Sequence, residues 1–206
     1  MAHGMGAWDD EYSRKGVLWS GLTHDLPELP PRSLVLELGC GNGKTLPALI
    51  RRGWNVIAID SSQKAVTMSR NLVKGSSPAE IMVADACHIP LRDTTFDAVF
   101  ANHVIGHLQE PDREKIAFEV NRTLKPGGIL FFCEFSTEDV RYGKGHATEP
   151  STFMRGTKII THYFTLQEVS DLFFGLTCKS IILHQWPMRI RGNNLVRSEV
   201  IAIFSK

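Results

Sequence analysis

The sequence lacks the features that mark a disulfide-stabilised, zinc-binding or membrane protein. It contains no Cys-x-x-Cys pair, and Cys40, Cys87, Cys133 and Cys178 stand apart at apolar positions of the 206-residue chain. This spacing predicts reduced core cysteines and no metal site. No stretch approaches the roughly 18 uncharged apolar residues of a membrane-spanning helix, and the N-terminal residues lack the apolar core of a signal peptide. We therefore expect a cytoplasmic protein without a membrane partner.

An excess of charge of either sign is also absent. Lys and Arg number 23 against 22 Asp and Glu, which gives a formal net charge of +1. Such a balance excludes a general attraction to nucleic acid or to an anionic membrane. A local basic cluster at Arg189, Arg191 and Arg197 still leaves open a surface that binds an anionic substrate or a nucleic acid phosphate.

Short apolar runs alternate with amphipathic segments through most of the chain. Strands that are apolar almost throughout are typical of a parallel sheet covered by helices on both faces, so the alternation predicts a doubly wound, Rossmann-like α/β fold. We expect strands over residues 33–38, 55–60, 80–85, 96–102 and 129–135, and helices over 44–52, 63–73 and 112–124.

The C-terminal part breaks this alternation. A helix is expected over 166–174, with Thr165 as its N-cap. "CKSIILHQW" (178–186) and "SEVIAIFSK" (198–206) then predict two strands with no helix between them, which should pair antiparallel. The expected sheet therefore has seven strands, mostly parallel, with an antiparallel C-terminal pair.

The chain length suits one domain over residues 1–206. Residues 1–30 form an N-terminal arm in this interpretation. Residues 136–164 are polar and glycine-bearing, and they are long for a connection inside a compact domain. We expect them to form a substrate-binding loop or to be disordered.

The segment "ELGCGNGKT" (37–45) has three interpretations, two of which place a phosphate on it. A phosphate loop of an ATPase would need its first glycine at position 38, which is Leu. A dinucleotide fingerprint would need its third glycine at position 44, which is Lys. In both cases Glu37 would direct a carboxylate towards a polyphosphate, so both interpretations are disfavoured.

The third interpretation is S-adenosylmethionine, which carries an ammonium and a sulfonium and no phosphate. Glu37 can attract the ammonium, and the glycines let the backbone approach the ligand without Cβ clashes. Asp60, at the end of the second expected strand, is placed to accept both ribose hydroxyl protons. Asp85, at the end of the third, can reach the adenine amino group. The carboxyl ends of strands are where open α/β sheets bind ligands.

Five segments in order resemble the motifs of class I S-adenosylmethionine-dependent methyltransferases. They are "LELGCGNGK", "AID", "ADACHIPL", "FDAVFANHVIGHL" and "RTLKPGGILFFCEF". The similarity covers about residues 33–135, and further, looser similarity connects the chain to small-molecule enzymes of the tellurite-resistance and thiopurine type. The resemblance implies S-adenosyl-L-methionine as cofactor, bound by Glu37, Gly39, Cys40, Gly41, Asp60 and Asp85, with Ser61, Ala86 and Asn102 flanking the ribose, adenine and sulfonium.

Candidates for a catalytic base stand just after the fourth expected strand, in "NHVIGH". His103 and His107 are four residues apart, but position 104 is Val, so the His-Glu-x-x-His pattern of zinc proteases does not fit. One of the two histidines, His107 first, is expected to face the substrate. The alternative is a histidine that hydrogen-bonds to a neighbouring loop.

Acceptor contacts are expected from the arm and from residues 136–164. Trp8, Tyr12 and Trp19 of "WDDEYSRKGVLW" (8–19) could form a lid over the cofactor or simply pack on the sheet. Tyr142, Arg155 and His162 are expected to contact the acceptor.

The function we expect is methyl transfer to a small-molecule acceptor by in-line displacement. One alternative is a tRNA methyltransferase of the wobble-uridine type, because the core and "RGNNLVRSEVIAIF" faintly resemble those enzymes. Another alternative is a module that binds S-adenosylmethionine without catalysis.

Overall fold

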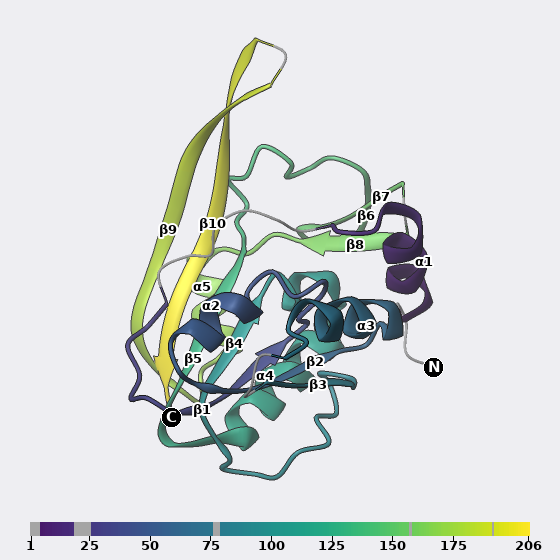
Figure 1. Ribbon diagram of the computed structural model, residues 1–206. Helices are drawn as coiled ribbons and strands as arrows, with labels where there is room; N and C mark the ends of the chain where they lie inside the picture. Colours follow the sequence, from purple (N-terminus) through teal and green to yellow (C-terminus); the bar gives the residue numbers. More distant parts are fainter. Residues whose placement is uncertain (1–4, 19–25, 76–78, 157, 191) are drawn as a thin grey trace.

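A mixed sheet with helices on both faces forms the molecule (Figure 1). The computed structural model describes residues 5–18, 26–75, 79–156, 158–190 and 192–206. Seven strands lie in the order β3-β2-β1-β4-β5-β10-β9, which confirms the predicted doubly wound, seven-stranded fold. Their bounds are β1 (Leu34–Leu38), β2 (Asn55–Asp60), β3 (Ala79–Val83), β4 (Phe96–Asn102), β5 (Leu124–Phe135), β9 (Thr177–Ile190) and β10 (Asn193–Ser205). The first five are parallel, and β10 pairs antiparallel with both β5 and β9.

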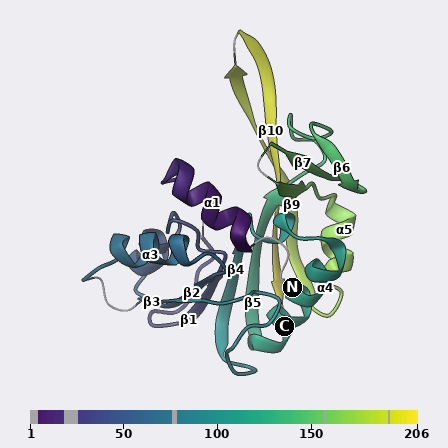
Figure 2. The same ribbon diagram turned by 90° about the vertical axis from the view of Figure 1, so that its right-hand side faces the viewer.

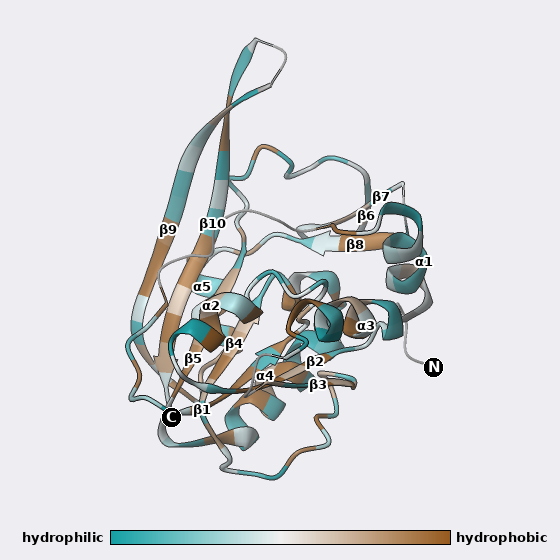
Figure 3. Cartoon of the chain, viewed as in Figure 1, coloured by the Kyte–Doolittle hydropathy of each residue, from teal (hydrophilic) through white to brown (hydrophobic). Residues whose placement is uncertain are grey.

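Two hydrophobic clusters, one on each face of the sheet, explain why the inner strands are apolar throughout. In β5, Leu130 and Phe132 belong to the cluster that includes α4 (Glu110–Thr123) and α5 (Leu166–Leu172). Phe131 and Cys133, on the opposite face, belong to the cluster that includes α2 (Leu46–Arg51) and α3 (Gln63–Leu72). Figure 3 shows the resulting apolar colour along the central strands. Helices on both faces leave the carboxyl ends of the strands as the accessible edge.

The helices follow the prediction with local differences at their starts. The predicted start of the first at Lys44 is wrong: α2 begins at Leu46, with Thr45 as its N-cap, because the glycine turn extends further than expected. The helix predicted over 112–124 begins at Glu110 and ends at Thr123. The predicted N-cap Thr165 is confirmed, since its side chain accepts a hydrogen bond from the backbone N–H of Glu168 at 3.1 Å.

Residues 136–164 hold regular structure where a loop was expected. A three-stranded antiparallel sheet consists of β6 (His146–Glu149), β7 (Thr152–Arg155) and β8 (Ile159–His162). Tyr142 and Phe153 lie edge to face with ring centroids 5.3 Å apart, and Tyr142 and Tyr163 do so at 5.7 Å. Packing of these rings stabilises the small sheet, which sits beside the carboxyl ends of the main sheet (Figure 1).

The last two strands are longer than predicted and form a hairpin. β10 pairs with β5 over Glu199–Ser205, so the part of the hairpin before Glu199 projects beyond the main sheet (Figure 1). Cys178 at the start of β9 is exposed, so its predicted place in the core is wrong, while the other three cysteines are buried.

The described part of the N-terminal arm begins with a helix, α1 (Met5–Lys15). It packs beside α3 near the ends of the parallel strands (Figure 2). Among the described residues, no helix combines the length and apolar character needed to cross a membrane.

Candidate active site

The turn after β1 takes its shape from glycines in the left-handed region. Gly39 has φ +63° and Gly41 has φ +54°, a backbone conformation that L side chains rarely adopt. A Cβ atom at Gly39 would stand 2.6 Å from Cγ2 of Val104, so only glycine lets this turn approach the loop after β4. The N–H of Gly41 donates to Oδ2 of Asp60 at 2.8 Å, which joins the turn to the end of β2.

Two adjoining cavities lie at the carboxyl ends of β1, β2 and β4, where the strand order reverses. Gly39 and His103 line both of them. The first, of about 360 Å³, is lined also by Asp60, Ser61, Asp85 and Ala86. The second, of about 470 Å³, is lined also by Glu37, Cys40, Gly41 and Asn102. The structure thus brings all nine residues that were predicted to bind a cofactor to two adjoining cavities, which together are called the cofactor cleft below.

Glu37 is a buried carboxyl group that lacks a donor for one oxygen. It is 3% exposed, and its Oε2 has no hydrogen-bond partner among the described residues. Burial raises the pKa of Glu37 to about 8, against a hydrogen bond from the Thr45 hydroxyl that lowers it, and the nearby Asp60 raises it further. A cation placed at Oε2 would reverse this shift.

Asp60 is already held by the backbone around it. Its Oδ1 accepts from the N–H of Ser62 and its Oδ2 from that of Gly41, both at 2.8 Å. Burial raises the pKa of Asp60 despite these two hydrogen bonds, and the neighbouring carboxylate of Asp9 also raises it. The carboxylate is therefore fixed in orientation at the first cavity of the cofactor cleft.

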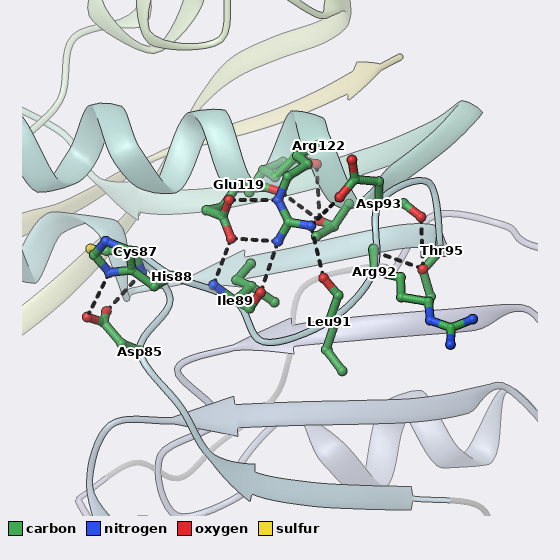
Figure 4. Close-up of polar contacts among 12 residues, drawn as sticks. Asp85, Cys87, His88, Ile89, Leu91, Arg92, Asp93, Thr95, Glu119 and Arg122 are labelled. Atoms are coloured by element: carbon green, nitrogen blue, oxygen red, sulfur yellow. Dashed lines mark hydrogen bonds and ion pairs between the residues drawn. The ribbon is translucent and has the colours of Figure 1, made fainter.

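Asp85 lies in the loop after β3, which ends at Val83, so the prediction that the strand continues to residue 85 is wrong. Its Oδ1 accepts from the N–H of Cys87 at 2.9 Å. Figure 4 shows how α4 holds this loop: Arg122 donates to the carbonyls of Ile89 and Leu91, and its charge is paired with Glu119. Asp85 thus precedes a loop segment, residues 89–91, that α4 holds in place.

His107 presents an unoccupied ring nitrogen. Its Nδ1–H donates to the carbonyl of Ile160 in β8 at 2.8 Å, while its buried Nε2 has no partner among the described residues. Burial lowers the pKa of His107 against the opposing effects of Glu134 and the Ile160 hydrogen bond. The imidazole is therefore neutral, with an Nε2 lone pair able to accept a proton.

His103 differs from His107 in both conformation and charge. Its backbone has φ +52°, which is unusual for a residue with a side chain. Burial lowers its pKa, but contacts with Cys133, Glu134 and Glu199 outweigh burial and raise the pKa well above its ordinary value. The raised pKa of His103 disfavours it as a base, and the lowered pKa and unpartnered Nε2 of His107 favour that residue instead.

A third cavity, of about 710 Å³, lies between α1 and the small sheet and is called the arm cavity below. Trp8 and His107 line both this cavity and the cofactor cleft, and their rings meet edge to face with centroids 4.8 Å apart. Arg141 and Arg155 also line it. Trp8 and His107 therefore form the boundary between the two spaces.

Of the remaining residues predicted to contact the acceptor, some line a cavity and others do not. Tyr12 lines the cofactor cleft and Arg155 the arm cavity. His162 is buried, and its ring nitrogens lie 2.7 Å from the Thr152 hydroxyl and 2.7 Å from Glu168. Both nitrogens therefore have partners within the protein, which leaves neither for an acceptor. Tyr142 packs within the small sheet and lines neither space. Trp19 lies outside the described residues.

Comparison with known proteins relates the chain to methyltransferases. Residues 36–132 match a family model described as "Methyltransferase domain". The demethylmenaquinone methyltransferase of Clavibacter sepedonicus is 37% identical over 106 residues, 52% of this chain and 42% of that one. The tRNA (carboxymethyluridine(34)-5-O)-methyltransferase of Arabidopsis thaliana is 33% identical over 127 residues, 61% of this chain and 30% of that one. The chain thus spans less than half the length of these two relatives.

Among solved structures, an S-adenosylmethionine-dependent methyltransferase from Methanosarcina mazei superposes with a TM-score of 0.73 at 24% identity, over 86% of this chain and 94% of that one. The strand order defines a doubly wound α/β fold with its cleft at the carboxyl ends of the strands, where such sheets bind ligands. More particularly, residues 36–132 match the methyltransferase domain family, and the chain shares its fold with an S-adenosylmethionine-dependent methyltransferase, which points to S-adenosyl-L-methionine as the cofactor.

Proposed function

We propose that the chain transfers a methyl group from S-adenosyl-L-methionine to an anionic small molecule bound in the arm cavity, with His107 as the base. The observation that carries this proposal is the free, buried Nε2 of His107 on the boundary between the cofactor cleft and the arm cavity. A group at this boundary can meet both the acceptor and the reactive end of the cofactor.

The residues of the cofactor cleft fit this cofactor, which supplies a methyl group activated by a sulfonium. Glu37, with Oε2 free, binds the ammonium and Asp60 binds the ribose hydroxyls. Asp85 and Ala86 contact the adenine, and Asn102 lies towards the sulfonium. This assignment is supported by the missing donor at Glu37 and by the separation of the acids along the cofactor cleft.

Arg141 supports an anionic acceptor. Its Nε donates to Asp139 at 3.0 Å, and the guanidinium lies over the Phe135 ring at 3.9 Å. Its buried Nη2 has no partner among the described residues. An arginine that is fixed on two sides and free on the third can bind a carboxylate or phosphate of the acceptor through a charge-assisted hydrogen bond.

A base is needed only if the acceptor atom loses a proton, as a hydroxyl or ammonium does. His107 takes that proton on Nε2, because Nδ1–H is fixed by the Ile160 carbonyl. Trp8, with Tyr12 beside it at a centroid distance of 6.1 Å, excludes water from the boundary as part of the arm. Alignment of acceptor and methyl group by these contacts contributes about 7–11 kcal/mol in favourable cases.

The test is transfer of labelled methyl to cell extract separated into small molecules, RNA and protein. Label should enter the small-molecule fraction and be retained on an anion exchanger. With the purified acceptor, His107→Gln should lower kcat by about 10²- to 10⁴-fold, and the Kd of the cofactor should stay unchanged. Binding of the cofactor without label in any fraction would instead support a non-catalytic module.

A second candidate is tRNA methylation, favoured by the Arabidopsis relative and by the projecting hairpin. Arg189 is exposed on this hairpin, whereas Arg197 is paired with Asp139 at 2.6 Å and Arg191 lies outside the described residues. If tRNA is the acceptor, label enters the RNA fraction, and Arg189→Ala weakens a salt-dependent tRNA affinity. Unlabelled RNA would exclude this candidate.

A further inference from the structure

Three side chains from three neighbouring strands converge beside the cofactor cleft. His103 follows β4, Cys133 lies in β5 and Glu199 lies in β10. Nε2 of His103 is 3.1 Å from Oε1 of Glu199, and Sγ of Cys133 is 4.0 Å from that Nε2 and 3.7 Å from Oε2 of Glu199. One imidazole nitrogen, one sulfur and one carboxylate oxygen thus form a triangle whose corners all lie within 4.8 Å of one another.

The size of this triangle matches one face of a tetrahedral zinc site. Zinc lies about 2.3 Å from sulfur and about 2.0–2.2 Å from nitrogen or oxygen, so tetrahedral ligand atoms are roughly 3.4–3.6 Å apart. The separations of 3.1 Å to Oε1 of Glu199, 3.7 Å to its Oε2 and 4.0 Å between the sulfur and the imidazole nitrogen lie on either side of that range. Side-chain rotations would have to bring one oxygen of Glu199 towards both other atoms for the three to bind one ion.

Two of the three side chains are buried, and the third, His103, is 19% exposed. Cys133 is 0% and Glu199 is 4% exposed. The N–H of His103 donates to the carbonyl of Cys133 at 2.9 Å, and the left-handed φ of His103 aims its ring towards the other two side chains. Strained backbone of this kind persists where the surrounding structure holds it, and it concentrates at functional sites.

The other ring nitrogen of His103 faces a carboxylate, as in many metal sites. Its Nδ1 is 3.8 Å from Oε2 of Glu134 and is buried without a hydrogen-bond partner among the described residues. Glu134 is itself held by the N–H of Gly106, which donates to Oε1 at 2.9 Å. Histidines that bind metals commonly donate their second N–H to a carboxylate, which orients the ring and raises its basicity.

The triangle is open on the side of the second cavity of the cofactor cleft, which all three side chains line. His184, the cross-strand partner of Glu199, lines the same cavity from β9. Three protein ligands with an open fourth position are the arrangement of catalytic rather than structural zinc. Sulfur and imidazole ligands favour zinc and related transition metals over magnesium and calcium.

We propose that His103, Cys133 and Glu199 bind one divalent transition-metal ion, zinc by preference, with its fourth coordination position facing the cofactor cleft. This goes beyond methyl transfer and departs from the sequence expectation of no metal.

The experiment titrates the chelator-treated full chain with Co²⁺. Binding of one equivalent should produce a thiolate-to-cobalt charge-transfer band and the visible bands of a tetrahedral ion, and Zn²⁺ should abolish both. Cys133→Ser should remove the charge-transfer band, while the matched control Cys178→Ser, at the exposed cysteine, should retain it. Glu134→Gln, which leaves the three ligands intact, should weaken metal binding by about 10- to 100-fold.

X-ray absorption of the zinc-loaded wild-type chain provides a readout that needs no variant. It should show one sulfur at about 2.3 Å and nitrogen or oxygen ligands at about 2.0–2.2 Å. Absence of the cobalt band, its persistence in folded Cys133→Ser, or a zinc shell without sulfur would overturn the proposal. None of these readouts depends on turnover. The metal proposal can therefore be tested even if the proposed methyl acceptor is wrong.

Discussion

At the scale of single residues, the environment assigns opposite roles to groups of similar chemistry. Burial lowers the pKa of His107, whereas contacts with Cys133, Glu134 and Glu199 raise the pKa of His103. Glu37 is buried without a donor for Oε2, whereas Asp60 is held by two backbone N–H groups. The chemistry of the site therefore depends on the contacts around each side chain more than on its residue type.

Glu37 should make cofactor binding depend on pH. Without cofactor its pKa is about 8 instead of the ordinary 4.5, and a bound ammonium favours the carboxylate, so binding releases a proton. Cofactor affinity should therefore rise as the pH increases towards 8, by about tenfold per pH unit, and calorimetry in buffers of different ionisation enthalpy should detect the released proton. Glu37→Gln should remove this slope, and an unchanged slope in that variant would contradict the assignment.

The same shift affects folding of the cofactor-free chain. The folded pKa of Glu37 lies above the unfolded value, so its contribution to stability is fully present below 4.5 and is lost as the pH rises through 8. Chemical denaturation should show wild type losing stability relative to Glu37→Gln across that window. A constant difference between the two would mean that Glu37 is ionised in the folded state.

Asp60→Asn should weaken cofactor binding by about 10- to 100-fold, since one charged acceptor of ribose hydroxyls contributes about 1.5–3 kcal/mol. Asp97→Asn is the matched control. Asp97 also accepts from a backbone N–H, that of Leu34 at 2.8 Å, but it lies near the start of β4, away from the cleft. Equilibrium binding by calorimetry should show a weaker Kd for Asp60→Asn alone, and equal effects in both variants would point to a general loss of structure.

Motif positions made part of this site predictable from the sequence. Glu37, Asp60 and Asp85 follow apolar runs of a parallel sheet, so their proximity follows from strand order. His103 and Cys133 are 30 residues apart and Cys133 and Glu199 are 66 apart, so His103 and Glu199 are separated by 96 residues. Their contact depends on the antiparallel return of β10. No local pattern carries that information, which is why the metal-ligand triangle emerges only in three dimensions.

At the scale of elements, the Asp9 side chain ties α1 of the arm to the start of α3. Oδ1 of Asp9 in α1 accepts from the Ser62 hydroxyl at 2.5 Å and from the N–H of Lys64 at 3.1 Å. These donors lie at the start of α3, next to Asp60, so α1 is tied to the cofactor cleft. This tie is the structural basis for the lid proposed for the arm.

Asp9→Ala should loosen the arm, since helix-capping side chains contribute about 0.5–2 kcal/mol. Hydrogen exchange should become several-fold faster in α1 and in the first turn of α3, and the rest of the main sheet should be unaffected. Asp10→Ala is the control, because Asp10 is the exposed neighbour on the same helix. Equal exchange in both variants would show that Asp9 does not hold α1.

Elements differ in how far the sequence could predict them. The five parallel strands carry apolar runs long enough to recognise, and both the N-cap of α5 and the antiparallel tail were predictable from local patterns. The strands of the small sheet are four residues each and are joined by glycine-bearing turns. At that length apolar periodicity does not distinguish strand from loop, so the interactions of Tyr142, Phe153 and Tyr163 determine the structure instead.

At the scale of the whole molecule, the fold is stabilised by two cores that share one sheet, while the cleft lies where the strands end. Phe132 illustrates the first point, because its ring meets Phe164 and Phe173 edge to face at 5.3 and 5.7 Å. Those contacts join β5, the segment after β8 and the end of α5. In the antiparallel strand β10, Phe204 joins the same core, with its ring centroid 5.3 Å from that of Phe173. The C-terminal hairpin therefore contributes to the stability of the fold.

Phe173 and Phe174 provide a matched test of this architecture, because adjacent residues of one type are 2% and 90% exposed. Phe173→Ala removes a ring that touches Phe132 and Phe204, and it should lower the free energy of unfolding by about 3–5 kcal/mol. That is a large part of the roughly 5–15 kcal/mol available to a domain. Phe174→Ala should change it by less than about 0.5 kcal/mol. Urea denaturation followed by circular dichroism measures both variants, and similar losses would contradict a core that depends on packing between α5, β5 and β10.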